Sequence, residues 1–461
     1  MPLAFAGHSI RRLSTPLLTA LLLATAPALS ARAIQAPAHG SGSVRPSPVR
    51  AVDRVNAPPA DSLLHLHWLY ATVDRVNPRI RAAGELARAM AARVPGATKP
   101  PDPELQLGFM NYMLPRLTPD EALGMRQIQL MQMVPLPGKL AAAGDAARAR
   151  AQAANARAAE VRWEARVAAA MAFYELWAAH ERIDIARETR RLLENAAAVA
   201  TAMYRVGDGR QSDVLRARVE IARMDEEIIR MQTMAEVAQA RIAAAIDLPE
   251  PSVRGRPMFP SFPDSVPART ELEETALRAR PMLAAGEAEV RAAAADERLA
   301  RRERWPDVQV GLQYGERGSP MGTDRMGSLM IGASLPVFAR SRQVRMREEA
   351  AAMRAMTEAD VRAMRADTRA RVAEASADLG RARRLAALYR RTVLPQAEAA
   401  AASALASYRT GAVDFMTVLE NRMTVNRYRE ELVTLAADEG RAWADLEMLL
   451  GRALLSPVEA R

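Results

Sequence analysis

Four short segments of the chain alternate apolar with polar residues at a period of two. They lie at residues 104–113, 125–134, 307–316 and 327–336. The third is the clearest, and its two sets of residues are Val308, Val310, Leu312 and Tyr314 against Gln309, Gly311, Gln313 and Gly315. Such alternation predicts strands with one apolar and one polar face. It fits a transmembrane barrel strand, apolar toward lipid and polar toward a lumen, and equally a half-buried hairpin in a soluble domain.

Long helical segments follow each pair of predicted strands. Residues 145–206 contain neither glycine nor proline, and their larger apolar side chains recur at spacings of three and four. A glycine-rich turn then separates this segment from a second helix that must fold back. We therefore predict helical hairpins over residues 140–246 and 342–450, with kinks at Gly380 and Pro395 in the longer arm of the second.

The chain is a duplication. The motif Tyr-x-x-Gly at 204–207 recurs at 408–411, and both copies are followed by Val-Leu at the same spacing. A Pro-x-x-Gln-x-Gly motif likewise recurs, at 103–108 and 306–311. Two copies of one strand-strand-helix-helix unit are therefore expected. The predicted divisions are a first repeat at 61–250, a linker at 251–270, a second repeat at 271–451 and a tail at 452–461.

The amino terminus resembles an export signal. Arg11 and Arg12 precede an apolar run that is too short to span a bilayer, and small-residue cleavage patterns follow. We predict a signal peptide at residues 1–33 and a mobile linker, rich in proline, glycine and serine, at residues 34–60. The chain has no cysteine, which excludes disulfides and an acylated cysteine.

Charge and motifs exclude several function classes. The net charge of +10 arises from 64 basic residues interleaved with 54 acidic ones, as on solvated helix faces, so no nucleic-acid partner is expected. Hydrolase, nucleotide-binding and zinc-protease motifs are absent. We predict no enzyme activity, catalytic residue, cofactor or metal site. His65 and His67 fall in a helical pattern, which argues against a metal site there.

Methionine is frequent, with 24 copies. Met110, Met131, Met133 and Met330 fall on the polar side of the predicted strands, which would be the lumen side of a barrel. Thioethers are soft ligands that suit Cu(I) and similar ions, although methionine also serves as a flexible apolar filler. What would contact this face therefore stays open, with a metal ion as one hypothesis.

Four strands cannot close a barrel, and an open sheet edge in lipid would leave backbone groups unsatisfied. If these strands lie in a membrane, several copies must combine them. With Asn77-Pro78, the exit Pro135-Leu-Pro-Gly-Lys139 and the two Tyr-x-x-Gly turns, the duplicated chain resembles the TolC-type outer-membrane efflux family over nearly its whole mature length.

The resemblance implies a mainly α fold with a small β part. Three copies would form a twelve-strand transmembrane β-barrel in the outer-membrane lipid, continuous with a periplasmic α-helical barrel. Such a homotrimer docks onto a periplasmic adaptor and an inner-membrane pump and conducts substrates passively. The residues that the resemblance places at the adaptor-docking tip are Arg205, Val206, Gly207, Asp208, Arg409, Thr410, Gly411 and Ala412.

The resemblance also implies an aperture at this tip. Asp213 and Tyr408 match family positions that tie neighbouring helices together, and Glu420 falls where the family often has a constriction carboxylate. A ring of carboxylates would favour cations, although Glu420 also fits a solvated helix position. Val413 and Thr417 stand where the best-known members have an arginine and an aspartate, so the full latch network is not expected.

One alternative from another class is a secreted coiled-coil adaptor or scaffold without a pore. A periplasmic adaptor should carry one helical hairpin beside a lipoyl-like β-domain. This chain instead has two hairpins and alternating strands, which favours the channel.

Overall fold

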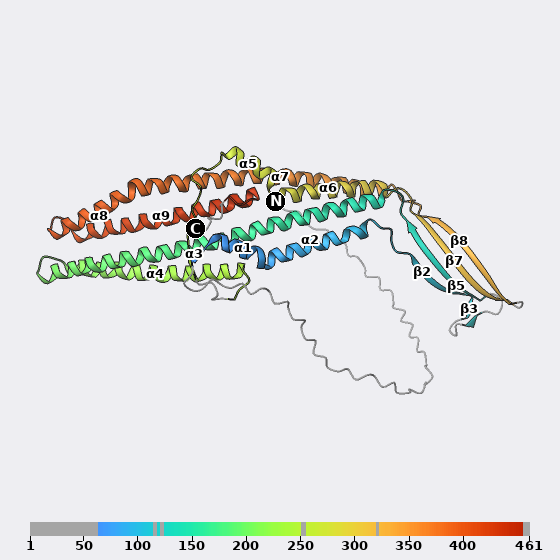
Figure 1. Ribbon diagram of the computed structural model, residues 1–461, viewed down its shortest axis with the longest axis horizontal. Helices are drawn as coiled ribbons and strands as arrows, with labels where there is room; N and C mark the ends of the chain where they lie inside the picture. The colour runs from blue at the N-terminus through green and yellow to red at the C-terminus, as the bar shows by residue number, and fades with distance from the viewer. Residues whose placement is uncertain (1–62, 114–117, 120–123, 250–254, 320–321, 455–461) are drawn as a thin grey trace, which may run out of the picture. The chain divides into compact units, whose positions relative to one another are not determined.

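The computed structural model describes residues 63–113, 118–119, 124–249, 255–319 and 322–454, all of them within one unit, Val55–Arg461 (Figure 1). The predicted signal peptide and the linker at 34–60 lie outside the described residues, as does most of the predicted tail.

The alternating segments form a four-stranded antiparallel sheet. Its strands are β2 (Glu104–Met110), β5 (Met125–Val134), β7 (Val308–Ser319) and β8 (Gly322–Ala333), in the order β2-β5-β7-β8. Each repeat thus contributes two neighbouring strands. Two small pairs accompany the sheet: β3 (Tyr112–Met113) with β4 (Thr118–Pro119), and β1 (Leu63–Leu64) in parallel with β6 (Arg256–Pro257).

Two strand boundaries differ from the sequence prediction. The strand predicted at 104–113 ends at Met110, because Asn111 adopts a left-handed backbone with φ of 54°. The strand predicted at 327–336 lies at Gly322–Ala333 instead. Its charged first half extends the hairpin through cross-strand ion pairs, with Arg325 3.5 Å from Glu316 and Asp324 3.4 Å from Arg317.

Helices make up most of the described residues. In the first repeat they are α1 (Leu66–Val76), α2 (Pro78–Ala97), α3 (Lys139–Arg205) and α4 (Gln211–Ala245). In the second they are α5 (Arg269–Ala279), α6 (Pro281–Arg302), α7 (Gln343–Leu388), the π-turn η1 (Tyr389–Val393), α8 (Leu394–Arg409) and α9 (Phe415–Leu450). The two sets correspond one to one, with α7, η1 and α8 together matching α3.

Each repeat begins with a short helix that stops before a proline. Pro78 and Pro281 occupy the first positions of α2 and α6, where a missing N–H costs nothing. The Asn77 side chain accepts hydrogen bonds from the backbone N–H of Arg79 (2.9 Å) and Ile80 (3.3 Å), and so caps α2. This explains the Asn-Pro signature.

Kinks were predicted at Gly380 and Pro395 in the long arm. α7 continues as a helix through Gly380, beside the buried Leu379 and Ala382. The irregularity lies at η1, directly before Pro395. A proline cannot donate to the preceding turn, and a π-turn widens the backbone so that its ring fits.

An outer layer covers one side of the long helices. Leu272 of α5 packs with Leu379 of α7 and Trp443 of α9, while α1 packs against α3. The segment predicted as a linker at 251–270 is described from residue 255 on. Residues 255–268 belong to this layer, and residues 269 and 270 begin α5. Within the layer, Phe259 meets Phe262 edge to face and contacts Trp177 of α3, while Phe262 stacks on Trp443 of α9.

The junction of sheet and helices is tied by one buried lysine. Lys139 is 5% exposed, and its Nζ donates to Asp307 Oδ1 (2.8 Å) and to the Trp305 carbonyl oxygen (3.0 Å). Gly138 has a φ of 93°, and a Cβ there would overlap the Arg302 guanidinium group. The Pro-Leu-Pro-Gly-Lys exit therefore joins β5 and α3 of the first repeat to α6 and β7 of the second.

Candidate functional site

The two faces of the sheet differ sharply in composition. One face carries a row of four leucines, one from each strand, directly opposite one another across the sheet: Leu105, Leu130, Leu312 and Leu329. Neighbouring rows add Leu107, Phe109, Ile128, Val310, Tyr314 and Ile331, which are between 36% and 74% exposed. These residues form one contiguous apolar surface, whereas the exposed apolar residues of an ordinary soluble protein are scattered singly.

The opposite face is lined by glutamine, glycine and methionine. Its central row is Gln106, Gln129, Gln313 and Ser328. All methionines of the four strands lie on this face, and none lies on the apolar one. They are Met110, Met125, Met131, Met133, Met326 and Met330.

Glycines make room for these methionines. A Cβ at Gly311 would contact both Met131 and Met330, and one at Gly315 would contact Met125. The four methionines predicted for this side are therefore confirmed to share one face. The prediction did not include Met125 and Met326 in this set. Met326 precedes the predicted start of its strand, and Met125 is the first residue of its strand.

The two Tyr-x-x-Gly motifs form the turns α3–α4 and α8–α9. Gly207 and Gly411 have φ values of 89° and 72°, which glycine adopts without strain. The backbone N–H of Asp208 donates to the Met203 carbonyl oxygen (3.0 Å), and that of Ala412 to the Ser407 carbonyl oxygen (2.9 Å). The eight residues predicted for the tip are all exposed: Arg205, Val206, Gly207, Asp208, Arg409, Thr410, Gly411 and Ala412.

The two turns differ in how the following helix begins. Asp414 caps α9 by accepting from the backbone N–H (2.9 Å) and the hydroxyl (2.7 Å) of Thr417. These bonds, with the nearby Arg210 and Arg216, lower the pKa of Asp414. Helix α4 starts after Arg210, which provides no side-chain cap, and carries Asp213 in its first turn.

Two of the three predicted aperture residues lie close together. Tyr408 is 6% exposed and packs edge-on against Phe415, with ring centroids 5.5 Å apart. Burial raises the pKa of Tyr408, and the charge of Asp213 adds to this effect. Glu420 is exposed, and its side chain makes no hydrogen bond or ion pair with any described residue. The equivalent tyrosine, Tyr204, is 47% exposed.

Two grooves run along the side of the helices away from the α5 layer. One, of about 610 Å³, lies between α6 and α7; the other, of about 440 Å³, lies between α7 and α9. Five of the α7 residues that line them are separated by multiples of seven: Met346, Met353, Asp360, Glu374 and Arg381. Residues so spaced share one side of a packed helix. We call this side of the helices the groove face.

Helix α3 contributes to the same face, again at multiples of seven, through Arg150, Arg157 and Met171. Val372 and Leu379 of α7 are also seven apart, but they contact α5 on the other side. The groove face and the outer layer therefore occupy different sides of the helices.

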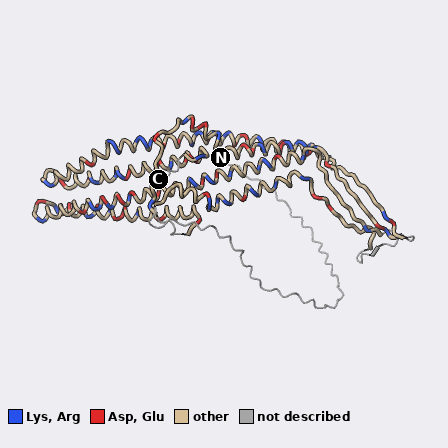
Figure 2. Tube along the Cα trace, viewed as in Figure 1, with Lys and Arg blue, Asp and Glu red and all other residues tan. Residues whose placement is uncertain are grey.

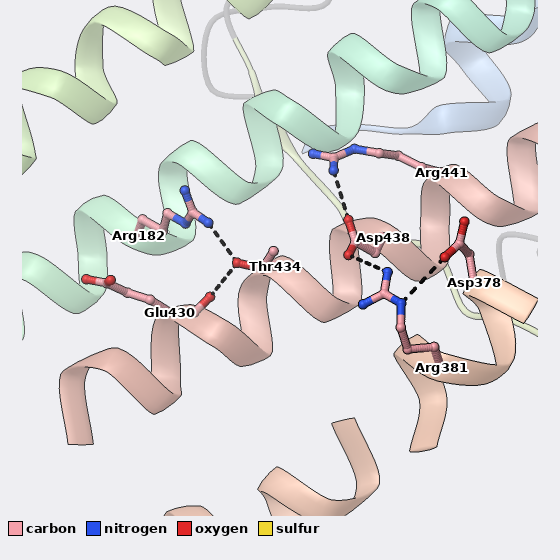
Figure 3. A network of polar contacts seen from close by, with 7 residues as sticks. All are labelled: Arg182, Asp378, Arg381, Glu430, Thr434, Asp438 and Arg441. Atoms are coloured by element: carbon pink, nitrogen blue, oxygen red, sulfur yellow. Dashed lines mark hydrogen bonds and ion pairs between the residues drawn. The ribbon is translucent and has the colours of Figure 1, made fainter. Parts of the chain in front are cut away.

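A polar network lies along the second groove and beside it (Figure 3). Asp438 accepts from Arg441 (3.0 Å) and Arg381 (3.3 Å), and so links α9 to α7. Arg182 of α3 donates to the Thr434 hydroxyl (2.7 Å). Burial raises the pKa of Asp445 in the same groove, against the lowering effect of Arg371. The groove face is thus charged and able to hold water.

Charges of both signs alternate along the helices, whereas the strands carry them mainly near their ends (Figure 2). No helix among the described residues is long and apolar enough to cross a membrane. Within the same residues, no group of three or more His, Asp or Glu side chains could hold a metal ion.

Comparison with protein families decides the assignment. The family described as "outer membrane efflux protein" matches residues 76–247 and 272–452, which correspond to the two repeats. The chain belongs to the outer membrane efflux protein family. It is therefore an efflux channel of the outer membrane, with its helices in the periplasm, and serves in tripartite efflux systems. Such channels are transport proteins and not enzymes. The family assignment excludes the alternative of a secreted coiled-coil adaptor or scaffold without a pore.

Solved structures share the fold. The outer-membrane channel OprN is 21% identical, with a TM-score of 0.72, and the match covers 85% of this chain and 91% of that one. For VceC from Vibrio cholerae the identity is 17% and the TM-score 0.71, over 84% and 96% of the two chains. The MtrE channel of Neisseria gonorrhoeae, in its open state, is 16% identical with a TM-score of 0.69, over 84% and 89%. Comparison with curated proteins gives no match.

Proposed function

We propose that three copies of this chain close into one ring and form a continuous passage from the helical tip to the cell exterior. A periplasmic adaptor and an inner-membrane pump deliver the substrate, and the channel conducts it passively. The number three is what the family resemblance implies.

The observation that carries this proposal is the agreement between two open edges. Strand order β2-β5-β7-β8 matches helix order α2-α3-α6-α7, since each strand continues into the helix at the same place. The sheet and the row of helices therefore end at the same two edges. One edge is formed by β2 and α2, and the other by β8 and α7. Helix α2 has no buried residue, and the outer strands have unpaired backbone groups. Pairing β8 with β2 of the next copy would satisfy the unpaired backbone groups of both strands. The same arrangement would bring α7 against α2 of that copy.

The sheet faces support a membrane position. In a closed ring the leucine face would contact lipid, and the glutamine and methionine face would line a lumen. The groove face of the helices would line the periplasmic part of the same passage, since the outer layer occupies the other side.

Adjacent residues of β8 provide a matched test of the faces. Ile331 is 74% exposed on the leucine face, and Met330 lies on the opposite one. Ile331→Arg should cost about 2–4 kcal/mol per copy in the bilayer and reduce outer-membrane assembly, whereas Met330→Arg should be tolerated. The readouts are outer-membrane fractionation, oligomeric mass in detergent and planar-bilayer conductance. Equal behaviour of the two variants, or a wild-type monomer that forms no pores, contradicts the proposal.

Docking at the tip is tested by site-specific crosslinking. The chain has no cysteine, so Val206→Cys introduces a unique thiol at a 72% exposed position of the α3–α4 turn. It should crosslink to the adaptor. Leu215→Cys, 52% exposed on the side of α4, is the control and should crosslink much less. The reverse result would remove the tip from the docking surface.

A further inference from the structure

The groove between α6 and α7 combines a cavity with an unusual lining. Its volume of about 610 Å³ is in the range that holds a drug-sized molecule. Met346, Met353 and Met356 of α7 line it and remain 39%, 51% and 50% exposed. Alanines of α6 and Leu299 form the facing wall. We call this cavity the methionine groove.

The charge of the methionine groove is negative. Its two arginines are Arg150 and Arg157, and its five carboxylates are Glu289, Asp296, Glu303, Glu349 and Asp360, which gives the lining a formal net charge of −3. Both arginines are already ion-paired, Arg150 with Asp296 and Arg157 with Glu289. Among the described residues, Glu349 and Asp360 have no ion-pair or hydrogen-bond partner. Two carboxylates are thus left for a ligand.

We propose that the methionine groove binds amphipathic organic cations, which have an aromatic or aliphatic body and one positive charge. The flexible, polarizable thioethers contact the apolar body and adapt to different shapes. Glu349 and Asp360 neutralise the charge. The inference rests on the proposed function, because the groove must open into the conduit for a passing substrate to reach it.

The position on α7 favours a small ligand over a helix of a neighbouring copy as the occupant. The groove residues Met346, Met353 and Asp360 continue, at multiples of seven, into Glu374 and Arg381 of the second groove. These residues of α7 lie on the groove face. The next copy would instead approach the free edge of α7, which is a different side of the helix.

The probe for this site is rhodamine 6G, a fluorescent lipophilic cation, added to the purified full-length oligomer in detergent. Fluorescence anisotropy should show saturable binding that weakens with salt, and anionic fluorescein should not bind. The double variant Glu349→Gln/Asp360→Asn should lower the affinity about tenfold, since two partly exposed charge contacts together contribute about one factor of ten.

The matched control is Glu348→Gln/Glu358→Gln. It removes the same charge from the same stretch of α7, at residues that do not line the groove, and it should bind the probe within about twofold of wild type. Equal weakening in both double variants would show a nonspecific charge effect and overturn the site, as would an absence of saturable binding to the wild type.

Access is measured with Met353→Cys, whose thiol is unique in this chain. A cationic methanethiosulfonate reagent should modify it in the oligomer, and rhodamine 6G should slow the reaction. A thiol that reacts only after the oligomer is dissociated would mean that a neighbouring copy covers the groove, which overturns the inference. Planar-bilayer conductance of the same preparation separates the two proposals: conducting channels without probe binding refute only the site, and binding without conductance refutes the channel.

Discussion

Arg280→Met tests the ion pair that is most deeply buried in the described helices. Arg280 stands between α5 and α6, and its Nε donates to Glu160 Oε1 of α3 at 3.1 Å. Its Nη1 donates to the hydroxyl of Thr368 on α7 at 2.8 Å. The two charged side chains are only 9% and 4% exposed. One cluster therefore holds three helices together.

The expected cost follows from what the variant leaves behind. Methionine fills a similar volume, but Glu160 keeps only the bond from the Met282 backbone N–H, at 3.1 Å. An unpaired buried charge destabilises by about 3–5 kcal/mol. The exposed pair Arg365–Glu287 also joins α7 to α6, with side chains 48% and 45% exposed. Arg365→Met should therefore cost only about 0.2–1 kcal/mol.

The pH dependence has a definite sign. Burial raises the pKa of Glu160 above its ordinary value even with Arg280 present. A carboxyl group whose pKa is raised in the folded protein favours folding at low pH, and this contribution is lost as the pH rises through the raised value. Removing Arg280 raises the pKa further. The variant should therefore be destabilised more at about pH 8 than at about pH 5.

The assay is thermal unfolding followed by circular dichroism at a fixed scan rate, because unfolding of such an oligomer is governed by rates. Arg280→Met should lower the apparent Tm several times more than Arg365→Met does. Adding Glu160→Gln should restore part of the loss, since a neutral amide is cheaper to bury than a lone carboxylate. If the double variant is no more stable than Arg280→Met, or the loss does not grow with pH, the buried-charge reasoning is refuted.

Two further predictions concern glycines and methionines. Gly440→Ala should destabilise by about 1–3 kcal/mol, because the new Cβ would overlap the fully buried ring of Tyr174. Gly380→Ala, where nothing lies within 4 Å, should stabilise by up to about 1 kcal/mol, and equal Tm shifts would contradict this. If the methionines of the sheet bind soft cations, Ag⁺ should block wild-type conductance reversibly and Met131→Leu/Met330→Leu should relieve the block; an unchanged block would reject them as ligands.

The sheet could be predicted from the sequence because its period is local. Alternation within β5 and β7 fixes which residues share a face, and no tertiary information is needed. The first half of β8 was missed for the opposite reason. Asp324 and Arg325 show no apolar alternation, and they extend the strand only because Arg317 and Glu316 stand opposite.

The grooves could not be predicted in the same way. Met346, Met353 and Asp360 recur every seven residues, but that pattern alone does not say which helix lies beside them or which side stays open. The side is decided by the outer layer, whose segment 255–268 looked like a linker. Its aromatic contacts with α3 and α9 depend on residues far away in the chain.

The tip shows how duplication can preserve a shape while separating roles. Both copies keep the glycine that the turn requires, yet the helix that follows is capped by Asp414 in one copy and begins after Arg210 in the other. Thr417 occupies the position that corresponds to Asp213 of the first repeat. Its hydroxyl and N–H complete the Asp414 cap. Asp213 does not take part in such a cap. Its charge contributes to raising the pKa of Tyr408 in the second repeat. The asymmetry between the repeats thus follows from helix capping: Thr417 completes the Asp414 cap, whereas Asp213 lies near Tyr408.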